Sequence, residues 1–210
     1  MVTVSKAVTI SPPNFQIAEF KIKGITPYVQ NAFPKKVIEE MEEKHKAGST
    51  AKKGTKRQPK DFDLAYEQSK HISEEGWYGI PAAAFRNAMI SACRIVGFKM
   101  TLAKLAVFVI EDGFDKNDDQ PLVKIIKGEP YHQNSMVRIA MDTPDIHARA
   151  HWKAGWEAKV KIRYDADMFT AEDLANLLTR VGLQVGIGEG RPDSKKSAGM
   201  GWGLFEIVNE

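Results

Sequence analysis

Strict alternation of hydrophobic and charged residues is clearest in one segment of the chain. Across residues 156–164, apolar and aromatic residues alternate with glutamate, lysine and arginine, which predicts a strand with one buried and one charged face. The apolar run 102–110, interrupted only by Lys104, predicts a central strand buried on both faces. Shorter runs of β-branched and aromatic residues predict further strands at 15–22, 122–126, 136–140 and 203–208.

Three- and four-residue spacing of apolar positions predicts two helices. Residues 80–96 have Pro81 in the first turn and Gly97 after the last, and their predicted buried stripe is Phe85, Met89, Ala92, Cys93 and Val96. Residues 170–182 open with Thr170 and Asp173 in capping-box spacing. Their stripe is Leu174, Leu177, Leu178 and Val181, and Gly182 is expected to end the helix.

Helices embedded among strands predict an α+β fold. We expect an antiparallel sheet with helices on one face, in the ferredoxin-like (split βαβ) arrangement. The chain is 43% hydrophobic and 27% charged, which excludes wholesale disorder and fits a single domain over residues 1–210.

The charge of the chain is unevenly distributed. Residues 44–60 contain seven lysines and arginines and no acidic residue, whereas the whole chain has a net charge of only +3, which leaves −4 for the rest. We therefore expect a mobile basic insertion on a mildly acidic body, and any polyanion site must be local. A solvated insertion without a role is the alternative.

Targeting and redox signals are absent from the sequence. The N-terminus lacks a charged start followed by an apolar core, and no apolar run approaches the length of a membrane span. Cys93 is the only cysteine, so no intrachain disulfide can form. These features predict a cytoplasmic protein without a membrane segment.

A glycine-rich loop over residues 186–203 carries the most chemical information. Six glycines alternate with other residues in two clusters, and Arg191, Lys195 and Lys196 lie between the clusters. Glycine permits positive φ and leaves backbone amides uncovered, so a phosphate can approach the main chain beside these cations. The pattern predicts an anion-binding loop; a long hairpin-like connection that uses glycine only for turns is the alternative.

Two standard nucleotide-binding motifs do not fit this loop. Counted from Gly190, Lys195 occupies the place of the second glycine of a P-loop. The spacing of Gly186, Gly188 and Gly190 also fails the dinucleotide fingerprint. Both motifs further require a strand before the loop and a helix after it, whereas this loop follows a predicted helix and precedes a predicted strand.

Three segments resemble a known family. Residues 78–94 read Tyr-Gly-Ile-Pro-Ala-Ala-Ala-Phe-Arg-Asn-Ala-Met-Ile-Ser-Ala-Cys-Arg and resemble the "(Y)IPGSSLKGALRSA" helix of the RAMP superfamily, the RNA-binding backbone subunits of CRISPR effector complexes. The glycine clusters at 186–191 and 199–205 resemble the C-terminal glycine loop and last strand of that superfamily. Residues 149–162 resemble its segment in which an arginine and a glycine precede a strand.

The resemblance implies a modified RNA-recognition-motif core that holds single-stranded RNA by its backbone and assembles head-to-tail along it in antiviral defence. Ala82, Ala83 and Ala84 replace the usual Gly-Ser-Ser, which removes a hydroxyl and amide site at the helix start. The chain is also short for a backbone subunit, which is expected of a stand-alone or virus-encoded relative. The family's binding positions correspond to Arg86, Asn87 and Arg94 on the helix, Arg149 before the strand, and residues 188–196 in the loop.

Catalysis is the competing function class. His45, His71, His132, His147 and His151 are available as acids or bases, so a metal-independent endoribonuclease is the first alternative. Asp61 and Asp63 occupy a place where RNA-cleaving relatives carry an aspartate, but solvated loop acids are the simpler interpretation. The acidic loop 111–119 fails the calcium-loop spacing. A virus-encoded mimic that binds a host protein complex is the second alternative.

We therefore predict a single-stranded nucleic-acid-binding protein, RNA favoured over DNA, with no catalytic residue, metal or cofactor. Expected partners are the strand itself, further copies in an oligomer or filament, and other subunits of a ribonucleoprotein complex. Trp152, Trp202 and Tyr78 are candidates for stacking on bases, and Trp202 is the best candidate for exposure. The predicted binding residues are Lys52, Lys53, Lys56, Arg57, Lys60, Arg86, Asn87, Arg94, Arg149, Gly188, Gly190, Arg191, Lys195, Lys196 and Trp202.

Overall fold

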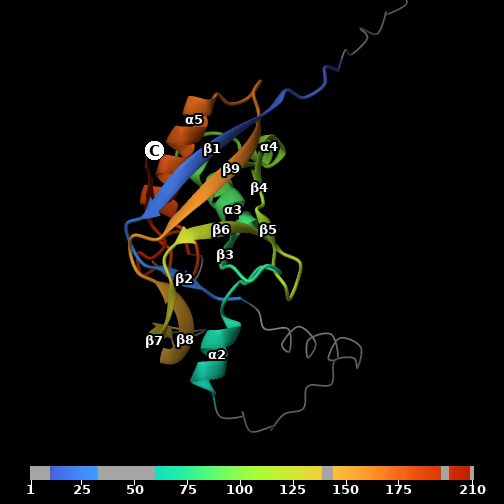
Figure 1. Cartoon of the computed structure of the whole chain (residues 1–210). Coiled ribbons are helices and arrows are strands. Elements are labelled where there is room, and N and C mark those ends of the chain that lie inside the picture. The colour runs from blue at the N-terminus through green and yellow to red at the C-terminus, as the bar shows by residue number, and fades with distance from the viewer. Residues whose placement is uncertain (1–9, 33–59, 139–143, 195–198, 209–210) are drawn as a thin grey trace, which may run out of the picture.

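The fold consists of two antiparallel sheets and a few helices, as the α+β prediction requires (Figure 1). The computed structural model describes residues 10–32, 60–138, 144–194 and 199–208. Within those ranges, no helix combines the length and the apolar character that crossing a bilayer demands.

The larger sheet has the strand order β10-β1-β9-β6-β3, with β4 added to β9 and β5 added to β6. Strand β9 is paired with β1 along its whole length, with Ala18 opposite Ile162 and Phe20 opposite Val160. The alternation over 156–164 is therefore confirmed as a half-buried strand. The strands are β1 (Phe15–Gly24), β3 (Gly79–Pro81), β4 (Val107–Ile110), β5 (Gly113–Phe114), β6 (Pro121–Lys127), β9 (Glu157–Asp165) and β10 (Phe205–Ile207).

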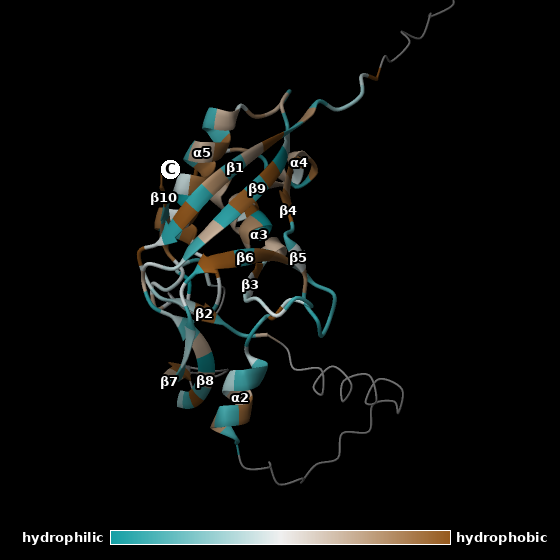
Figure 2. Ribbon diagram, viewed as in Figure 1, coloured by the Kyte–Doolittle hydropathy of each residue, from teal (hydrophilic) through white to brown (hydrophobic). Residues whose placement is uncertain are grey.

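Two helices, α3 (Ala82–Ala92) and α5 (Ala171–Arg180), cover one face of this sheet (Figure 1). The inward side chains of β9 are almost fully buried against both helices in one hydrophobic core. The opposite face of β1 and β9 carries no helix in the described part of the chain, and hydrophilic and hydrophobic residues alternate along both strands (Figure 2). The predicted core positions Trp156 and Tyr164 are 0% and 4% exposed.

A second sheet, which the sequence analysis did not predict, has the order β2-β8-β7. It consists of β2 (Tyr28–Gln30), β7 (Pro130–Arg138) and β8 (Pro144–Trp152), and α2 (Phe62–Gln68) packs against β8. The sequence did not predict β8. Its polar side chains, which include His147, Arg149 and His151, contact other segments of the chain and are not exposed to water.

The prediction of a central strand at 102–110 is wrong, because its first half is a helix and its second half is a strand that pairs with β9 alone among the described strands. Residues Met100–Ala106 form helix α4, and only Val107–Ile110 form strand β4. The helix buries Ala103 and Ala106, one turn apart, while Leu105 is 69% exposed. The run has the apolar composition of a buried strand because the leucines of α4 are exposed to solvent and not replaced by polar residues.

The ends of the two predicted helices also differ from expectation. Helix α3 ends at Ala92, so Val96 lies beyond it and is 48% exposed instead of buried. The capping box of Thr170 and Asp173 is confirmed. Gly182, however, does not end the second helix, because α5 continues into a π-helical turn, η2 (Val181–Val185), which stops at Gly186 with φ +72°.

Candidate nucleic-acid interface

The glycine loop connects η2 to β10, and its glycines are required by the backbone. Gly186, Gly188, Gly190, Gly199, Gly201 and Gly203 all have φ between +72° and +79°, a region that other residues rarely adopt. Close approach adds a second requirement. A Cβ at Gly203 would collide with the carbonyl oxygen of Ile187, and one at Gly188 would lie 2.6 Å from the carbonyl oxygen of Val29.

Most of the loop amides are not uncovered, which corrects the sequence interpretation. Ile187 N donates to Gly203 O at 3.1 Å, Glu189 N to Val29 O at 3.0 Å and Gly203 N to Pro27 O at 2.7 Å. The amides of Met200 and Trp202 both donate to Gly190 O. The two glycine clusters fold against each other and against β2, so these amides stabilise the loop and cannot also bind a phosphate.

Several amides of the loop remain as candidate phosphate donors. Within the described ranges, no acceptor is found for the amides of Gly188, Gly190 and Arg191 in one turn, or for those of Ser194 and Gly201, and all five residues are half-buried. Arg191 folds over the first of these turns, and its Nη1 donates to Gly188 O at 3.0 Å. This turn therefore offers three backbone N–H groups and one guanidinium as candidate ligands of an anion.

Arg94 contacts the loop from the turn after α3, and not from the helix where the sequence placed it, and the arginine is already paired. Arg94 Nη2 lies 2.8 Å from Asp193 Oδ1 and 2.7 Å from Ser91 Oγ, and Ser91 also donates to Asp193. The Ser91 hydroxyl first, and then Arg94 and Arg191, hold the pKa of the Asp193 carboxyl below its usual range. Asp193 thus fixes the loop to α3 and places Arg94 and Arg191 beside one carboxylate.

Arg149 on β8 reaches the other side of the loop. Its Nε donates to Glu189 Oε2 at 2.9 Å, and His147 Nδ1 lies 3.5 Å from Glu189 Oε1. His147 Nε2 is also 3.5 Å from Asp145, which pairs with Lys60. The predicted residues Arg149 and Lys60 therefore belong to one line of ion pairs that runs along β8 to the loop.

Arg86 and Asn87 take different positions from each other. Arg86 donates to Lys104 O at 2.6 Å and to Val107 O at 3.0 Å, so it satisfies carbonyl groups at the end of α4. Its guanidinium is therefore occupied at α4 and makes no contact with the glycine loop among the described residues. Asn87 is exposed, one turn before Ser91 on α3, and it stays a candidate contact.

The aromatic candidates are less exposed than the sequence analysis expected. Trp152 is 0% exposed and packs between Tyr28 and Tyr78, with ring centroids 5.6 and 5.9 Å away. Trp202 is half-buried, and its ring meets His151 edge-on at 5.1 Å. Trp152 cannot stack on a base, and Tyr78 is itself partly buried against the core.

The histidines divide into structural and accessible ones. His71 is buried beside Asp115, with Nδ1 2.8 Å from Oδ2. His151 is 1% exposed, and burial lowers its pKa to about 4. His132 stacks on Tyr66 with centroids 4.9 Å apart. Of the four histidines that the structure describes, His147 alone contacts the glycine loop through a carboxylate.

The acidic candidates have structural roles. Asp61 is the N-cap of α2 and accepts a hydrogen bond from Leu64 N at 2.9 Å, and Asp63 lies 3.3 Å from His132. No cluster of side chains suited to a metal ion occurs among the described residues. Lys52, Lys53, Lys56, Arg57, Lys195, Lys196 and His45 lie outside the described residues.

The structure thus unites part of the predicted site and adds residues that were not predicted. Arg94, Arg149 and Arg191 meet around the glycine loop, whereas Arg86 lies elsewhere. Ser91, Asp193 and Glu189 are the additions. They contact partners 40 to 102 positions away in sequence, so no local spacing could have identified them.

Comparison with known proteins gives a likeness of fold to solved structures. No family model matches the chain, and no curated protein matches it. The fold is similar to that of a chain in a solved structure, "Cryo-EM structure of the Type III-B Cmr-beta bound to cognate target RNA", with a TM-score of 0.53 and 10% sequence identity. The match covers 93% of this chain and 60% of that one. At this identity the likeness concerns the fold alone.

A RAMP-like fold is consistent with that likeness. The neighbouring chain comes from the Type III-B Cmr-beta structure, which was solved with its cognate target RNA. The chain spans only 60% of the neighbour's length.

Proposed function

We propose that this protein binds single-stranded nucleic acid, RNA in preference to DNA, by its phosphate backbone. The observation that carries the proposal is the turn at Gly188, Gly190 and Arg191, where half-buried backbone amides, for which the described residues supply no acceptor, lie beside a guanidinium. Backbone amides and arginine together are well suited to phosphate oxygens. Base identity would contribute little, so sequence dependence should be weak.

Arginines around this turn extend the binding surface. Arg94 and Arg149 are each held by a carboxylate, Asp193 and Glu189, at 2.8 and 2.9 Å. A phosphate that exchanges for either carboxylate keeps the arginine paired, so the ion pairs position the cations before the strand binds. Lys52, Lys53, Lys56, Arg57, Lys60, Lys195 and Lys196 would add further electrostatic attraction.

The same proposal includes the arrangement of the whole chain. We place the binding surface on one domain, residues 1–210, with a modified RNA-recognition-motif (ferredoxin-like) core and a basic insertion at 44–60. Several copies would line up head-to-tail along a strand, alone or with other subunits of a ribonucleoprotein complex. The fold likeness to a subunit of an RNA-bound complex supports this arrangement.

Purification from cells tests the proposal directly. The protein should copurify with material that raises the absorbance at 260 nm relative to 280 nm, and RNase should remove that material more completely than DNase. Preparations that carry no nucleic acid, and that fail to shift a labelled oligonucleotide at low salt, would contradict the proposal.

The endoribonuclease alternative gains one specific observation, because His147 lies between Asp145 and Glu189 and next to the glycine loop. Cleavage of labelled RNA in EDTA that disappears in a His147→Ala variant would favour this alternative. Binding without cleavage would leave the protein as a binder only.

A further inference from the structure

The helix-free face of the larger sheet carries an aromatic cluster that the proposed site does not use. Phe15 on β1 and Phe108 on β4 lie on either side of Arg163 on β9, because β9 runs between those two strands. The Arg163 guanidinium lies 5.1 Å from the ring centroid of Phe15 and 4.9 Å from that of Phe108. The two rings meet edge-on at 5.8 Å.

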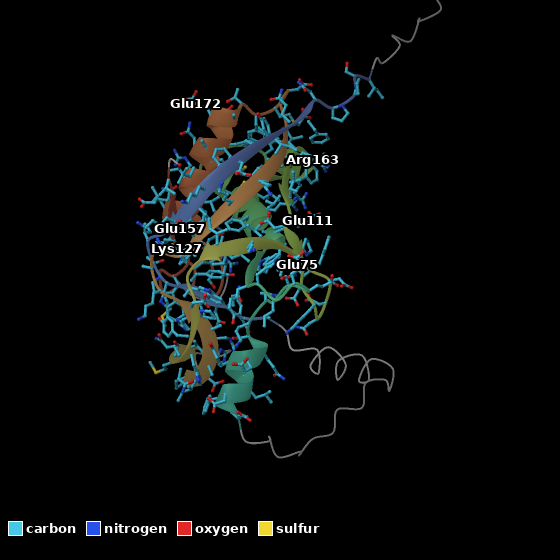
Figure 3. All side chains as sticks on the ribbon, in the orientation of Figure 1. Glu75, Glu111, Lys127, Glu157, Arg163 and Glu172 are labelled. Carbon is cyan, nitrogen blue, oxygen red and sulfur yellow. The ribbon has the colours of Figure 1, made fainter. Side chains whose placement is uncertain are left out.

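Arg163 differs in its pairing from Lys21, Lys127 and Lys161 on this face. Lys21 and Lys127 both pair with Glu157, at 3.1 and 3.0 Å, and Lys161 pairs with Asp112 at 3.0 Å. Among the described residues, no carboxylate pairs with Arg163, whose side chain rests on the two rings. Figure 3 shows Arg163 at the end of β9 beside β4, with Glu157 and Lys127 at the other end of the strand.

The apolar residues around Arg163 are exposed to an unusual degree for a strand. Phe15 is 40% exposed and Ile17, opposite Arg163, is 63% exposed. The cluster is small, since the rest of the face is occupied by ion pairs. It is therefore too narrow for an amphipathic helix, which needs a continuous apolar stripe.

A nucleotide of a single strand fits these features better. Its planar base can stack on an exposed phenylalanine, and its phosphate can pair with a guanidinium for which the described residues supply no carboxylate. The Phe108 ring also lies 4.9 Å from the Arg86 guanidinium, so it supports Arg163 and is not itself open to a base. We propose that Phe15 and Arg163, supported by Phe108, form a stacking site for an unpaired base of single-stranded nucleic acid. The inference rests on the proposed function and adds a second contact, on the face of the sheet opposite α3.

The experiment compares two 12-nucleotide probes, oligo(U) and an abasic oligomer with the same phosphates, by fluorescence anisotropy. Phe15→Ala should weaken oligo(U) binding about fivefold or more, as loss of one stacked base predicts, and should leave abasic binding and the salt dependence unchanged. Phe114→Ala is the matched control, because Phe114 is 46% exposed on β5 outside the cluster. Phe15→Tyr should restore binding, which separates stacking from folding.

Different failures have different meanings. If the wild type binds oligo(U) but Phe15→Ala behaves like Phe114→Ala, the stacking site is wrong and the proposed function stands. Equal weakening of both probes also overturns the stacking site. A change of oligomeric state in Phe15→Ala without a change in oligo(U) affinity would assign this face to protein contacts instead. If the wild type binds neither probe at low salt, both proposals fail.

Discussion

Individual residues in the glycine loop stabilise its conformation to a greater extent than the composition of the loop indicates. A glycine-rich, basic segment predicts accessible backbone, yet the amides of Ile187, Glu189 and Gly203 are used to close the loop. Composition reports which φ values are permitted; it does not report which amides find acceptors in distant segments such as Pro27 and Val29. Prediction at this scale therefore overestimated the number of free donors in the loop.

Two glycines of the loop offer a matched test of its structure. Gly201 and Gly203 have nearly the same φ, +74° and +73°, but a Cβ at Gly201 meets nothing within 4 Å, whereas one at Gly203 collides with the carbonyl of Ile187. Gly201→Ala should reduce the free energy of unfolding by about 1–2 kcal/mol, because only the left-handed conformation of the backbone opposes the alanine. Gly203→Ala should reduce the free energy of unfolding by more, about 3 kcal/mol, because the loop must also open.

Urea denaturation of the two variants measures this difference. Equal destabilisation by Gly201→Ala and Gly203→Ala would mean that the two clusters do not pack against each other as described.

At the scale of elements, helices and strands with a regular hydrophobic period were predicted from the sequence. Helices and strands whose residue pattern is set by tertiary contacts were not. The alternation in β9 and the capping box of α5 were sufficient signals. Helix α4 and strand β8 were not predicted, since α4 exposes Leu105 and β8 covers its polar side with the glycine loop. The binding surface depends on the second of these, because β8 supplies Arg149.

The contact between β8 and the loop predicts that a carboxylate restrains binding. Glu189→Gln keeps a hydrogen-bond acceptor for Arg149 Nε but removes the charge that competes with phosphate. Affinity for oligo(U) at low salt should rise roughly threefold, and the slope of log K against log salt should become more negative by about 0.7, the contribution of one phosphate contact on a single strand.

Glu74→Gln controls for net charge in this comparison, because Glu74 is exposed and its backbone contacts Phe114, outside the loop. If Glu74→Gln raises the affinity for oligo(U) as much as Glu189→Gln does, the effect comes from the change in net charge and not from the contact with Arg149. Weaker binding by Glu189→Gln would contradict a phosphate role for Arg149.

At the scale of the whole molecule, the chain has a net charge of +3 but carries −4 outside residues 44–60, so this mildly acidic body has to bind a polyanion locally. The arginines that the structure brings together come from the turn after α3, from β8 and from the glycine loop, and ion pairs with Asp193 and Glu189 hold two of them. The α+β fold class was accessible from sequence, and so was the glycine loop as a candidate site. The second sheet and the pairing of the arginines were not, because both depend on contacts between distant parts of the chain.

The central claim is that Arg94 and Arg191 beside the glycine loop bind phosphates. We would measure oligo(U) affinity by fluorescence anisotropy across a salt series for the wild type and for Arg94→Gln/Arg191→Gln. The control is Lys99→Gln/Lys116→Gln, which removes two exposed lysines outside these elements. With about five phosphates neutralised, the wild-type slope of log K against log salt should be roughly −3 to −4, and the arginine variant should lose about 1.4 of it. A flat wild-type response, or an arginine variant whose slope matches that of the lysine control, would contradict the account.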